Sequence, residues 1–408
     1  MNINALGASH KGKVRKSNED SYLIDNDLSL YIVCDGMGGH EYGQVASQLA
    51  CEVILKNILL YKNELKKYFE LLNQSNRAKL KFVIDKAINT ASAEVHQKGV
   101  ELNSVKGIGT TVVLVLISNT HAFLAHVGDS RIYLKRKDKL YQLTEDHTMA
   151  NQLIKSGQAT AAEVANIPGS GALFQAVGYQ KIVKVDQVSF ELRHEDQIIL
   201  CSDGLTKYAN DKKILEIFKN HDFENAAQVG VDYANEMGGG DNTTIIGIDV
   251  QQEIGTSTEV DVALKVEVLK EIPLFQNLNY NDLTKVLEIS RTHKFKKDAE
   301  IVKEGEPGDE LYIILIGSVD IFVGDMKVDK LKAGNYFGEM AMIDKRPRSA
   351  TVIANSYTII MGIKRNHFKL LIQNENSLGV RVLWNFTHRL SAMMRNVDQK
   401  ILDLKKPK

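Results

Sequence analysis

Apolar residues recur at helical spacing in two long stretches of the N-terminal half of the chain. Residues 43–61 carry one apolar face and residues 77–98 carry another, so the pattern predicts two amphipathic helices. The first face consists of Val45, Ala46, Leu49, Ala50, Val53, Ile54 and Ile58, and the second of Leu80, Val83, Ile84, Ala87, Ile88, Ala91 and Val95.

Short β-branched and apolar runs surround these helices and end in Gly- or Asp-bearing turns, a pattern typical of strands. Helices lying on antiparallel sheets predict an α+β layered domain. The expected strands are 30–34, 110–117, 122–127, 131–135, 197–201 and 243–249.

The pattern changes after residue 250, where residues 251–258 are polar and show no apolar period. We therefore expect a first domain over 1–250, a linker over 251–266 and a second domain over 267–408. In the second domain, a helix over 281–290, with Asn279 and Asp282 spaced like a capping pair, precedes Gly-punctuated strands typical of a small β-barrel.

Residues 374–404 predict a last helix, with leucine or valine at heptad spacing at Leu383, Leu390, Val397 and Leu404. Three alternatives follow for this C-terminal helix. It covers a bound nucleotide, it packs on its own barrel, anchored by Trp384, or it forms a homodimer through the heptad stripe.

Composition narrows the class of protein. The 408 residues suggest two or three domains, and 51 basic residues balance 51 acidic ones. We therefore expect no nucleic-acid and no membrane partner. No apolar run approaches the roughly 20 residues that span a bilayer. Three isolated cysteines, Cys34, Cys51 and Cys201, favour buried thiols in a reducing cytoplasm over a disulfide framework.

Three apolar runs end in an aspartate beside a glycine: Asp35, Asp129 and Asp203. Glu19-Asp20 and Asp241 occupy similarly tight settings. If these acids converge, their mutual repulsion requires cations. Oxygen ligands without a His/Cys cluster favour Mg²⁺ or Mn²⁺. A single Asp-Gly is usually only a turn, so the hypothesis rests on the combination.

Six spaced motifs over roughly the first 250 residues resemble, in order, those of the metal-dependent protein phosphatase 2C family, bacterial type. The resemblance implies an αββα sandwich with a binuclear metal centre between its sheets. The motifs are Arg15-Lys-Ser-Asn-Glu-Asp, Asp35-Gly-Met-Gly-Gly-His, Gly109-Thr-Thr, Gly128-Asp-Ser-Arg, Ser202-Asp-Gly-Leu and Gly240-Asp-Asn-Thr-Thr.

The resemblance also implies residue roles, with Arg15, Asp35, Asp203 and Asp241 as the catalytic set. Arg15 matches the phosphate clamp. Asp35 would bridge two ions, and the Gly36 carbonyl would bind one of them. Asp203 and Asp241 would complete the first site, Glu19 and Asp20 would serve the second directly or through water, and Asp129 with Asp203 would bind a third, weaker ion.

In this interpretation, water activated by the two metals attacks phosphorus in line, without a phosphoenzyme. Some family members have a histidine directly after the Asp-Gly, whereas this chain has Met37. A metal-bound water is then the favoured acid, with His40 as the lesser alternative. Residues 143–178 resemble the family's mobile flap.

The string Phe337-Gly-Glu-Met-Ala and the later Arg348-Ser-Ala closely resemble the phosphate-binding cassette of cyclic-nucleotide-binding domains, over about residues 267–395. The backbone behind Gly338 and the fork of Arg348 suit a phosphate. The resemblance implies Glu339 on the ribose and Arg348 on the cyclic phosphate. Further binding residues are Gly338, Met340, Ala341, Ser349 and Ala350. We expect cAMP ahead of cGMP.

The leading hypothesis is a cytoplasmic Mg²⁺- or Mn²⁺-dependent phosphatase that acts on phosphoserine and phosphothreonine in proteins and is regulated by a cyclic nucleotide. One alternative is a nucleotide-responsive docking protein whose phosphatase-like domain does not turn over. The other is a phosphatase whose C-terminal module only docks or dimerises.

Overall fold

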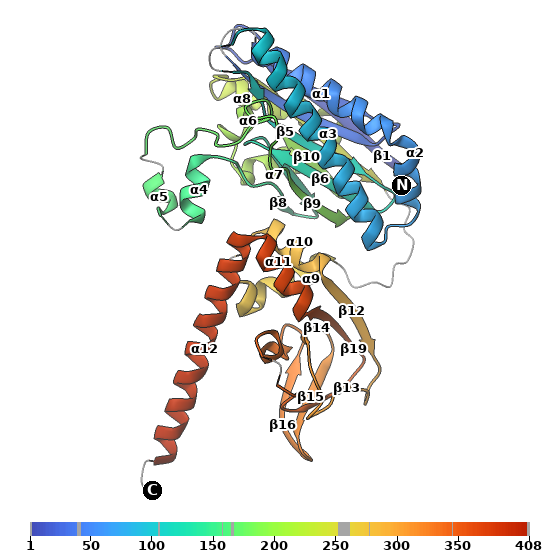
Figure 1. The fold of residues 1–408 in the computed structure, drawn as a ribbon, viewed down its shortest axis with the longest axis vertical. Helices are drawn as coiled ribbons and strands as arrows, with labels where there is room; N and C mark the ends of the chain where they lie inside the picture. The colour runs from blue at the N-terminus through green and yellow to red at the C-terminus, as the bar shows by residue number, and fades with distance from the viewer. Residues whose placement is uncertain are drawn as a thin grey trace. The chain divides into compact units, whose positions relative to one another are not determined.

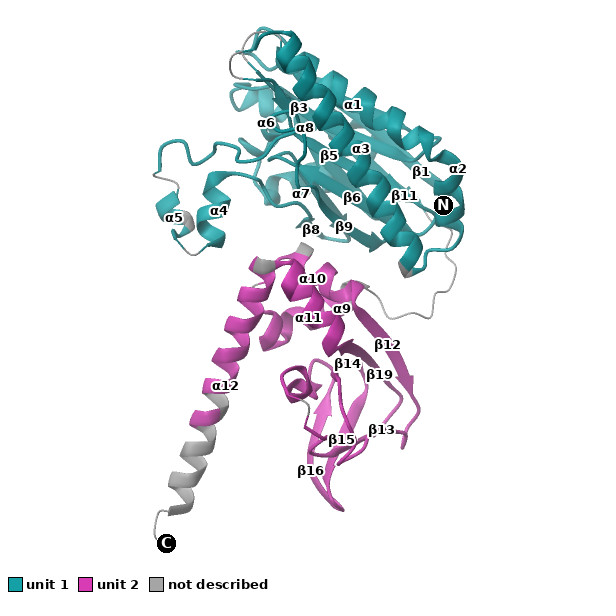
Figure 2. Cartoon of the chain, in the orientation of Figure 1, with its two compact units in different colours: residues 1–255 teal, residues 256–408 magenta. Residues whose placement is uncertain are grey.

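The computed structural model describes residues 2–38, 42–104, 107–156, 158–164, 167–251, 262–276, 278–344 and 346–405. The chain divides into two compact units, residues 1–255 and 256–408 (Figure 2). Within the expected linker, Gln251 ends a strand and residues 262–266 begin a helix, while 252–261 lie outside the described residues. No helix among the described residues is both long and apolar enough to cross a membrane.

Two antiparallel sheets lie face to face between helices in the N-terminal unit (Figure 1). One sheet has the order β1-β11-β10-β7-β8, and its strands are β1 (Asn2–His10), β7 (Arg131–Arg136), β8 (Lys139–Gln142), β10 (Gln197–Cys201) and β11 (Thr243–Gln251). The other has the order β2-β3-β5-β6-β9, and its strands are β2 (Asp20–Asp25), β3 (Leu30–Met37), β5 (Val112–Ile117), β6 (His121–Val127) and β9 (Asp186–Glu191), with β4 (Gly109–Thr110) paired to β3. The expected αββα fold class is confirmed.

Helices cover the outer face of each sheet because each offers one apolar side. The helices on the β2–β9 sheet are α1 (Tyr42–Leu60), α2 (Lys62–Glu70) and α3 (Gln74–Glu101). Those on the other sheet are α6 (Asp203–Thr206), α7 (Asp211–Asn220) and α8 (Phe223–Glu236). Both predicted long helices are confirmed. Ile54, Ile84 and Leu114 are fully buried in the core beneath them.

The strands fall where the apolar runs predicted them, with one interruption. The run 110–117 breaks at Thr111, which lies between β4 and β5. Its N–H donates to the carbonyl of Asp35 at 2.9 Å, and its Oγ1 accepts the Asp35 N–H at 2.9 Å. The break between β4 and β5 therefore lets Thr111 form two hydrogen bonds with Asp35 at the end of β3. The strands β1, β2, β8 and β9 were not predicted. The expected flap carries α4 (Met149–Lys155) and α5 (Ala161–Val164).

Two four-stranded antiparallel sheets form the β-roll of the C-terminal unit. Ile314, Val319 and Ile360 are fully buried between them. The strands are β12 (Ser290–Phe295), β13 (Glu300–Val302), β14 (Glu310–Ile316), β15 (Ser318–Val323), β16 (Met326–Lys332), β17 (Tyr336–Phe337), β18 (Thr351–Ala354) and β19 (Thr358–Lys364).

Helices flank this roll at both ends of its sequence. The capping pair is present, because Asn279 and Asp282 exchange side chain to backbone hydrogen bonds at the start of α10. The helix predicted over 374–404 corresponds to α12, and a further helix that was not predicted, α11, precedes it. The elements are α9 (Val262–Glu271), η1 (Pro273–Phe275), α10 (Tyr280–Glu288), η2 (Glu339–Met342), α11 (Arg365–Asn374) and α12 (Asn376–Lys405).

The proposed anchor on α12 is wrong. Trp384 is 65% exposed and Leu383 is 56% exposed, so neither side chain is packed on the roll. Of the heptad positions, Leu390 is partly buried, while the side chains of Val397 and Leu404 lie outside the described ones.

Candidate functional site

Four of the predicted acidic residues meet because their strands are neighbours. Asp20 on β2 lies directly opposite Asp35 on β3 in the antiparallel register. Asp203 follows β10, and Asp241 precedes β11, the strand that pairs with β10. The charges of Asp20, Asp203, Asp129 and Asp241 all act on Asp35. The two sheets thus deliver their acidic ends to one cluster.

The end of β3 is held rigidly by backbone contacts. Thr110 Oγ1 donates to the Asp35 carbonyl at 2.9 Å, and the Gly36 N–H donates to the Glu19 carbonyl at 3.1 Å. A Cβ on Gly36 would lie less than 3.0 Å from the carbonyl oxygens of Gly43 and Glu19. Glycine is therefore required where β3 passes between α1 and the Glu19 loop.

Crowding of carboxylates in a buried site raises their pKa values. Burial, and then the charges of Asp20 and Asp203, raise the pKa of Asp35 well above its usual range. Burial raises the pKa of Asp20 to about 7, with Asp203 and Asp241 adding to it. Burial and the charge of Asp203 raise the pKa of Asp129 to about 7. Cations bound here would relieve this penalty.

The donor set fits hard divalent ions. Oδ1 of Asp20 and Oδ1 of Asp203 are buried without a hydrogen-bond partner, although buried polar atoms are normally satisfied. Oδ2 of Asp20 accepts a hydrogen bond from Ser202 Oγ at 2.8 Å, which fixes the carboxylate plane. Two orphan carboxylate oxygens in an acidic cluster are what Mg²⁺ or Mn²⁺ would bind.

Arg15 and Glu19 lie at the edge of this cluster. Arg15 Nη2 lies 2.9 Å from Asp241 Oδ1, and its side chain is about half exposed. Burial raises the pKa of Glu19 and the charge of Arg15 opposes that change. The Glu19 N–H donates to Asn242 Oδ1 at 2.8 Å. Asn242 had no predicted role beyond its place in the Gly240-Asp241-Asn242 motif.

Asp241 differs from the other acids because two cations face it. Burial would raise its pKa, but a hydrogen bond and the charge of Lys207, with the charge of Arg15, outweigh burial and lower it. Lys207 Nζ also lies 2.8 Å from Asp203 Oδ2. Lys207 was not among the predicted site residues, although it lies four residues after Asp203, one helical turn away.

A buried His-His-Asp group supports the turn that presents Asp129. The Gly128 N–H donates to His147 Nδ1 at 3.1 Å, so His147 carries its proton on Nε2, 3.4 Å from Asp186 Oδ2. The rings of His126 and His147 stack at 4.7 Å. Burial lowers the pKa of His126 to about 4. With its ring nitrogens engaged, His147 holds the Gly128 turn. The predicted His40 lies outside the described residues.

All seven predicted nucleotide-binding residues line one cavity of about 480 Å³ in the C-terminal unit. Its volume is in the range that takes a small ligand. Apolar Val302, Ile321 and Leu331 complete its wall. The seven are Gly338, Glu339, Met340, Ala341, Arg348, Ser349 and Ala350.

Arg348 is held against the glycines of this cavity. Its Nη2 donates to the Glu310 carbonyl at 3.0 Å, and its guanidinium lies 5.4 Å from the Tyr312 ring centre. A Cβ on Gly338, which has φ +81°, would come within 3.0 Å of the Arg348 guanidinium. Arg365 Nη2 donates to the Gly308 carbonyl at 2.6 Å. Arg365, at the start of α11, was not predicted.

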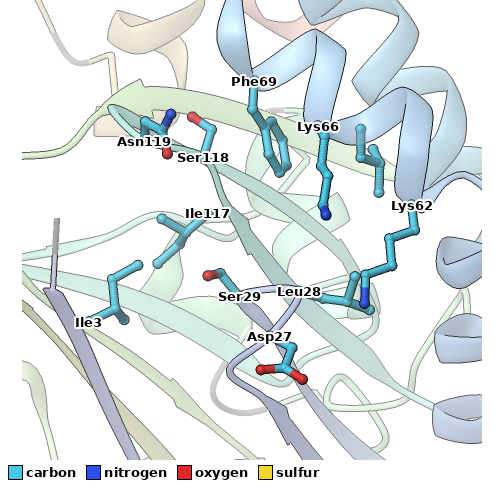
Figure 3. Close-up of a pocket in the computed structure, with 11 residues that line it drawn as sticks. Ile3, Asp27, Leu28, Ser29, Lys62, Lys66, Phe69, Ile117, Ser118 and Asn119 are labelled. Atoms are coloured by element: carbon cyan, nitrogen blue, oxygen red, sulfur yellow. The ribbon is translucent and has the colours of Figure 1, made fainter.

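Another hollow, of about 200 Å³, lies at the opposite end of β3 from Asp35 (Figure 3). Lys62 and Lys66 point into it from α2, and Asp27 is its one acidic lining residue. None of the predicted site residues line it. Two lysines beside one carboxylate do not suit a divalent metal, so this hollow is not a candidate metal site. The candidate metal site is the carboxylate cluster around Asp35.

Comparison with known families gives one family match in each of the two units. A family model described as "Protein phosphatase 2C" matches residues 6–236, and one described as "Cyclic nucleotide-binding domain" matches residues 292–375. The sandwich with its acidic strand ends defines a metal-dependent phosphatase class. The chain belongs to the protein phosphatase 2C family and carries a C-terminal cyclic nucleotide-binding domain.

Similar proteins are bacterial serine/threonine phosphatases. The phosphatase stp of Listeria innocua is 31% identical over 243 residues, which cover 59% of this chain and 92% of that protein. PstP of Mycobacterium tuberculosis is 32% identical over 243 residues, covering 59% of this chain and 44% of that protein. The chain is an enzyme of this phosphatase type.

Solved structures show the same fold. The crystal structure of M. tuberculosis PstP superposes with a TM-score of 0.53 at 28% identity, covering 61% of this chain and 99% of that one. The PstP catalytic domain in complex with two manganese ions has a TM-score of 0.51 at 28% identity, with coverage of 61% and 99%. These likenesses concern the N-terminal unit.

Proposed function

We propose that the chain hydrolyses phosphoserine and phosphothreonine in proteins at the carboxylate cluster, with Mg²⁺ or Mn²⁺. The observation that carries this is the meeting of Asp20, Asp35 and Asp203, two of which have orphan buried oxygens. In the proposal, Asp35, the Gly36 carbonyl, Asp203 and Asp241 hold one ion. Glu19, Asp20 and the bridging Asp35 hold the other. The two manganese ions in the PstP structure support this count.

When bound, these ions activate water as a nucleophile near neutral pH. The chain's own residues orient the substrate. Arg15, half exposed and anchored on Asp241, can turn two N–H groups toward the oxygens of a phosphate. Asp129 is placed beside Asp203 by the Gly128 turn. Whether these two also hold a third ion depends on Lys207, which already bonds to Asp203.

Substitution of one ligand tests the catalytic part. Asp203→Asn should lower the rate of phosphopeptide hydrolysis with Mn²⁺ by at least about 100-fold, a loss typical when one preorganised catalytic group is removed. Asp232→Asn, on α8 and away from the cluster, is the matched control and should keep the wild-type rate. Full activity in Asp203→Asn would contradict the role of Asp203, and a wild type that hydrolyses no phosphopeptide would leave the docking alternative.

We further propose that a cyclic nucleotide binds in the C-terminal cavity and regulates the phosphatase, with cAMP preferred over cGMP. The fixed guanidinium of Arg348 beside Gly338 suits the cyclic phosphate, and Glu339 on the same wall can accept a ribose hydroxyl. Phosphopeptide hydrolysis with and without each nucleotide, in wild type and Arg348→Ala, tests regulation. Titration with labelled cAMP against unlabelled cGMP tests preference. A rate that ignores both nucleotides would leave a docking or dimerisation module.

We also propose that α12 forms a homodimer. Val380, Leu383, Trp384 and Met394 are each more than half exposed on this one helix, and a second copy would bury them. Sedimentation of wild type and Trp384→Gln measures this. A wild-type monomer at micromolar concentration would contradict dimerisation.

A further inference from the structure

Lys207 is placed over the metal ligands by a helical turn. It follows α6, and its N–H donates to the Asp203 carbonyl at 2.9 Å. Residues four apart on a helix face one another, so the ammonium reaches back to the Asp203 side chain. Nζ lies 2.8 Å from Asp203 Oδ2 and forms a second ion pair with Asp241 Oδ2.

The residues around this double ion pair are also fixed. The next residue, Tyr208, accepts the Gly240 N–H on its hydroxyl at 3.0 Å. The Gly239 carbonyl accepts the Lys13 N–H at 2.7 Å. The loop that presents Asp241 is therefore tied both to α6 and to the N-terminal segment. Lys207, although its side chain is 45% exposed, is therefore paired with two acids whose backbone is fixed.

Lys207 uses one side of its carboxylates and leaves the other available. It bonds Oδ2 of Asp203, while Oδ1 of Asp203 is buried without a hydrogen-bond partner. Since a carboxylate has about four lone-pair sites, Asp203 can ligate a metal and keep Lys207. The ammonium thus already pairs with one of the two Asp203 oxygens, and one oxygen is left for a metal.

The charges of the cluster also favour two divalent ions. Among the described residues, the cations in ion-pair contact with the acids of this cluster are Arg15 and Lys207. Two divalent ions with these two side chains neutralise six carboxylates. A third divalent ion would leave a net positive charge in a partly buried site, which is costly. The six are Glu19, Asp20, Asp35, Asp129, Asp203 and Asp241.

We propose that the Lys207 ammonium is the third cation of this centre: it takes the place of a third, weaker ion beside Asp203 and limits the chain to two divalent ions. The inference rests on the proposed function of the cluster as a two-metal centre. Asp129 then faces a tethered charge in place of a metal.

Counting bound Mn²⁺ on the full chain tests this, by equilibrium dialysis at rising Mn²⁺ and by isothermal titration calorimetry. The wild type should bind two ions. Lys207→Met should bind a third, and should hold the first two about 30-fold tighter. This is the Coulomb term of a unit charge about 4 Å from a divalent ion even in water. Lys207→Arg keeps the charge and should bind two.

The controls separate the possible failures. Lys219→Met removes an exposed lysine of α7 that pairs with Asp138 and should match the wild type. Three ions on the wild type, or wild-type count and affinity in Lys207→Met, overturn the role of Lys207. No ion on the wild type overturns the metal centre itself. Melting in EDTA checks folding, and Lys207→Gln replaces Lys207→Met if that variant is unfolded.

Discussion

At the scale of single residues, the strongest structural contact outside the site is the buried pair of Arg136 and Asp196. Nε and Nη2 of Arg136 donate to the two carboxylate oxygens at 2.7 and 2.5 Å, and the side chains are 5% and 1% exposed. Arg136→Met should lower the free energy of unfolding by about 3–5 kcal/mol, because it leaves a buried carboxylate without its partner. Urea unfolding of the N-terminal unit measures this loss.

The matched control for Arg136→Met is Lys219→Met, which breaks the exposed pair with Asp138 at 2.7 Å. Exposed pairs contribute less than about 1 kcal/mol. Equal losses in the two variants would show that burial does not set the strength of the Arg136 pair.

Single residues were predictable where the chemistry departs from a common pattern. Asp35 and Asp203 were found because an acid that ends an apolar run has few structural reasons to be there. Lys207 escaped because a lysine one turn after an acid on a helix is usually a solvated surface pair. Only the approach of Asp241 from another strand, 34 residues later, gives Lys207 its double contact.

At the scale of elements, the junction of β3 with α1 determines where Asp35 lies. Gly36→Ala places a Cβ less than 3.0 Å from two backbone oxygens, which cannot move as a side chain can. We expect a loss of about 1–3 kcal/mol in stability, the usual cost of overpacking, together with weaker Mn²⁺ binding. Thermal melting and metal titration measure the two effects.

Gly171→Ala is the control for Gly36→Ala, since its Cβ would enter open space and its φ is not in the left-handed region. It should change stability by less than about 0.5 kcal/mol. A Gly36→Ala protein that melts and binds Mn²⁺ like Gly171→Ala would contradict the tight junction.

The strand-end acids also predict a pH dependence. Asp20 and Asp129 have pKa values of about 7 against an ordinary 3.8, so both hold protons at pH 6 that a metal must displace. Mn²⁺ affinity should rise with pH up to about 7 and level off above it. The stability of the metal-free protein should change with pH in the opposite direction. Between pH 3.8 and 7 the folded state binds more protons than the unfolded state. The free energy of unfolding therefore falls as pH rises through that window.

Calorimetric titrations of Mn²⁺ at pH 6 and pH 8, in buffers of different ionisation enthalpy, count the released protons. More protons should leave at pH 6. Equal release at both pH values would show that these acids are already ionised in the metal-free protein.

Elements were predictable where one sequence segment carries its own signal. The long helices α1 and α3 have complete apolar faces, and their bounds were close. In contrast, β1 has only two buried apolar residues, Ala5 and Ala8, and becomes a strand because β11, more than 230 residues away, pairs with all of it. Such nonlocal pairing leaves no periodicity to find.

At the scale of the whole molecule, two compact units on one chain predict two unfolding transitions with separate ligands. Each unit builds its own hydrophobic core. In differential scanning calorimetry, Mn²⁺ should raise the transition of the N-terminal unit, and cAMP that of the C-terminal unit. At 100 times its dissociation constant, a ligand stabilises its unit by about 2.7 kcal/mol.

Regulation requires that each ligand also changes the affinity of the protein for the other ligand. The same calorimetric experiment measures this coupling. If cAMP alters the phosphatase through the metal centre, it changes Mn²⁺ affinity by some factor, and Mn²⁺ must change cAMP affinity by the same factor. A coupling of about 1–3 kcal/mol corresponds to roughly 5- to 150-fold. Arg348→Ala should abolish the cAMP shift and keep the Mn²⁺ shift, while Asp203→Asn should do the reverse. If each ligand shifts only the transition of its own unit in the wild type, the two sites are not energetically coupled.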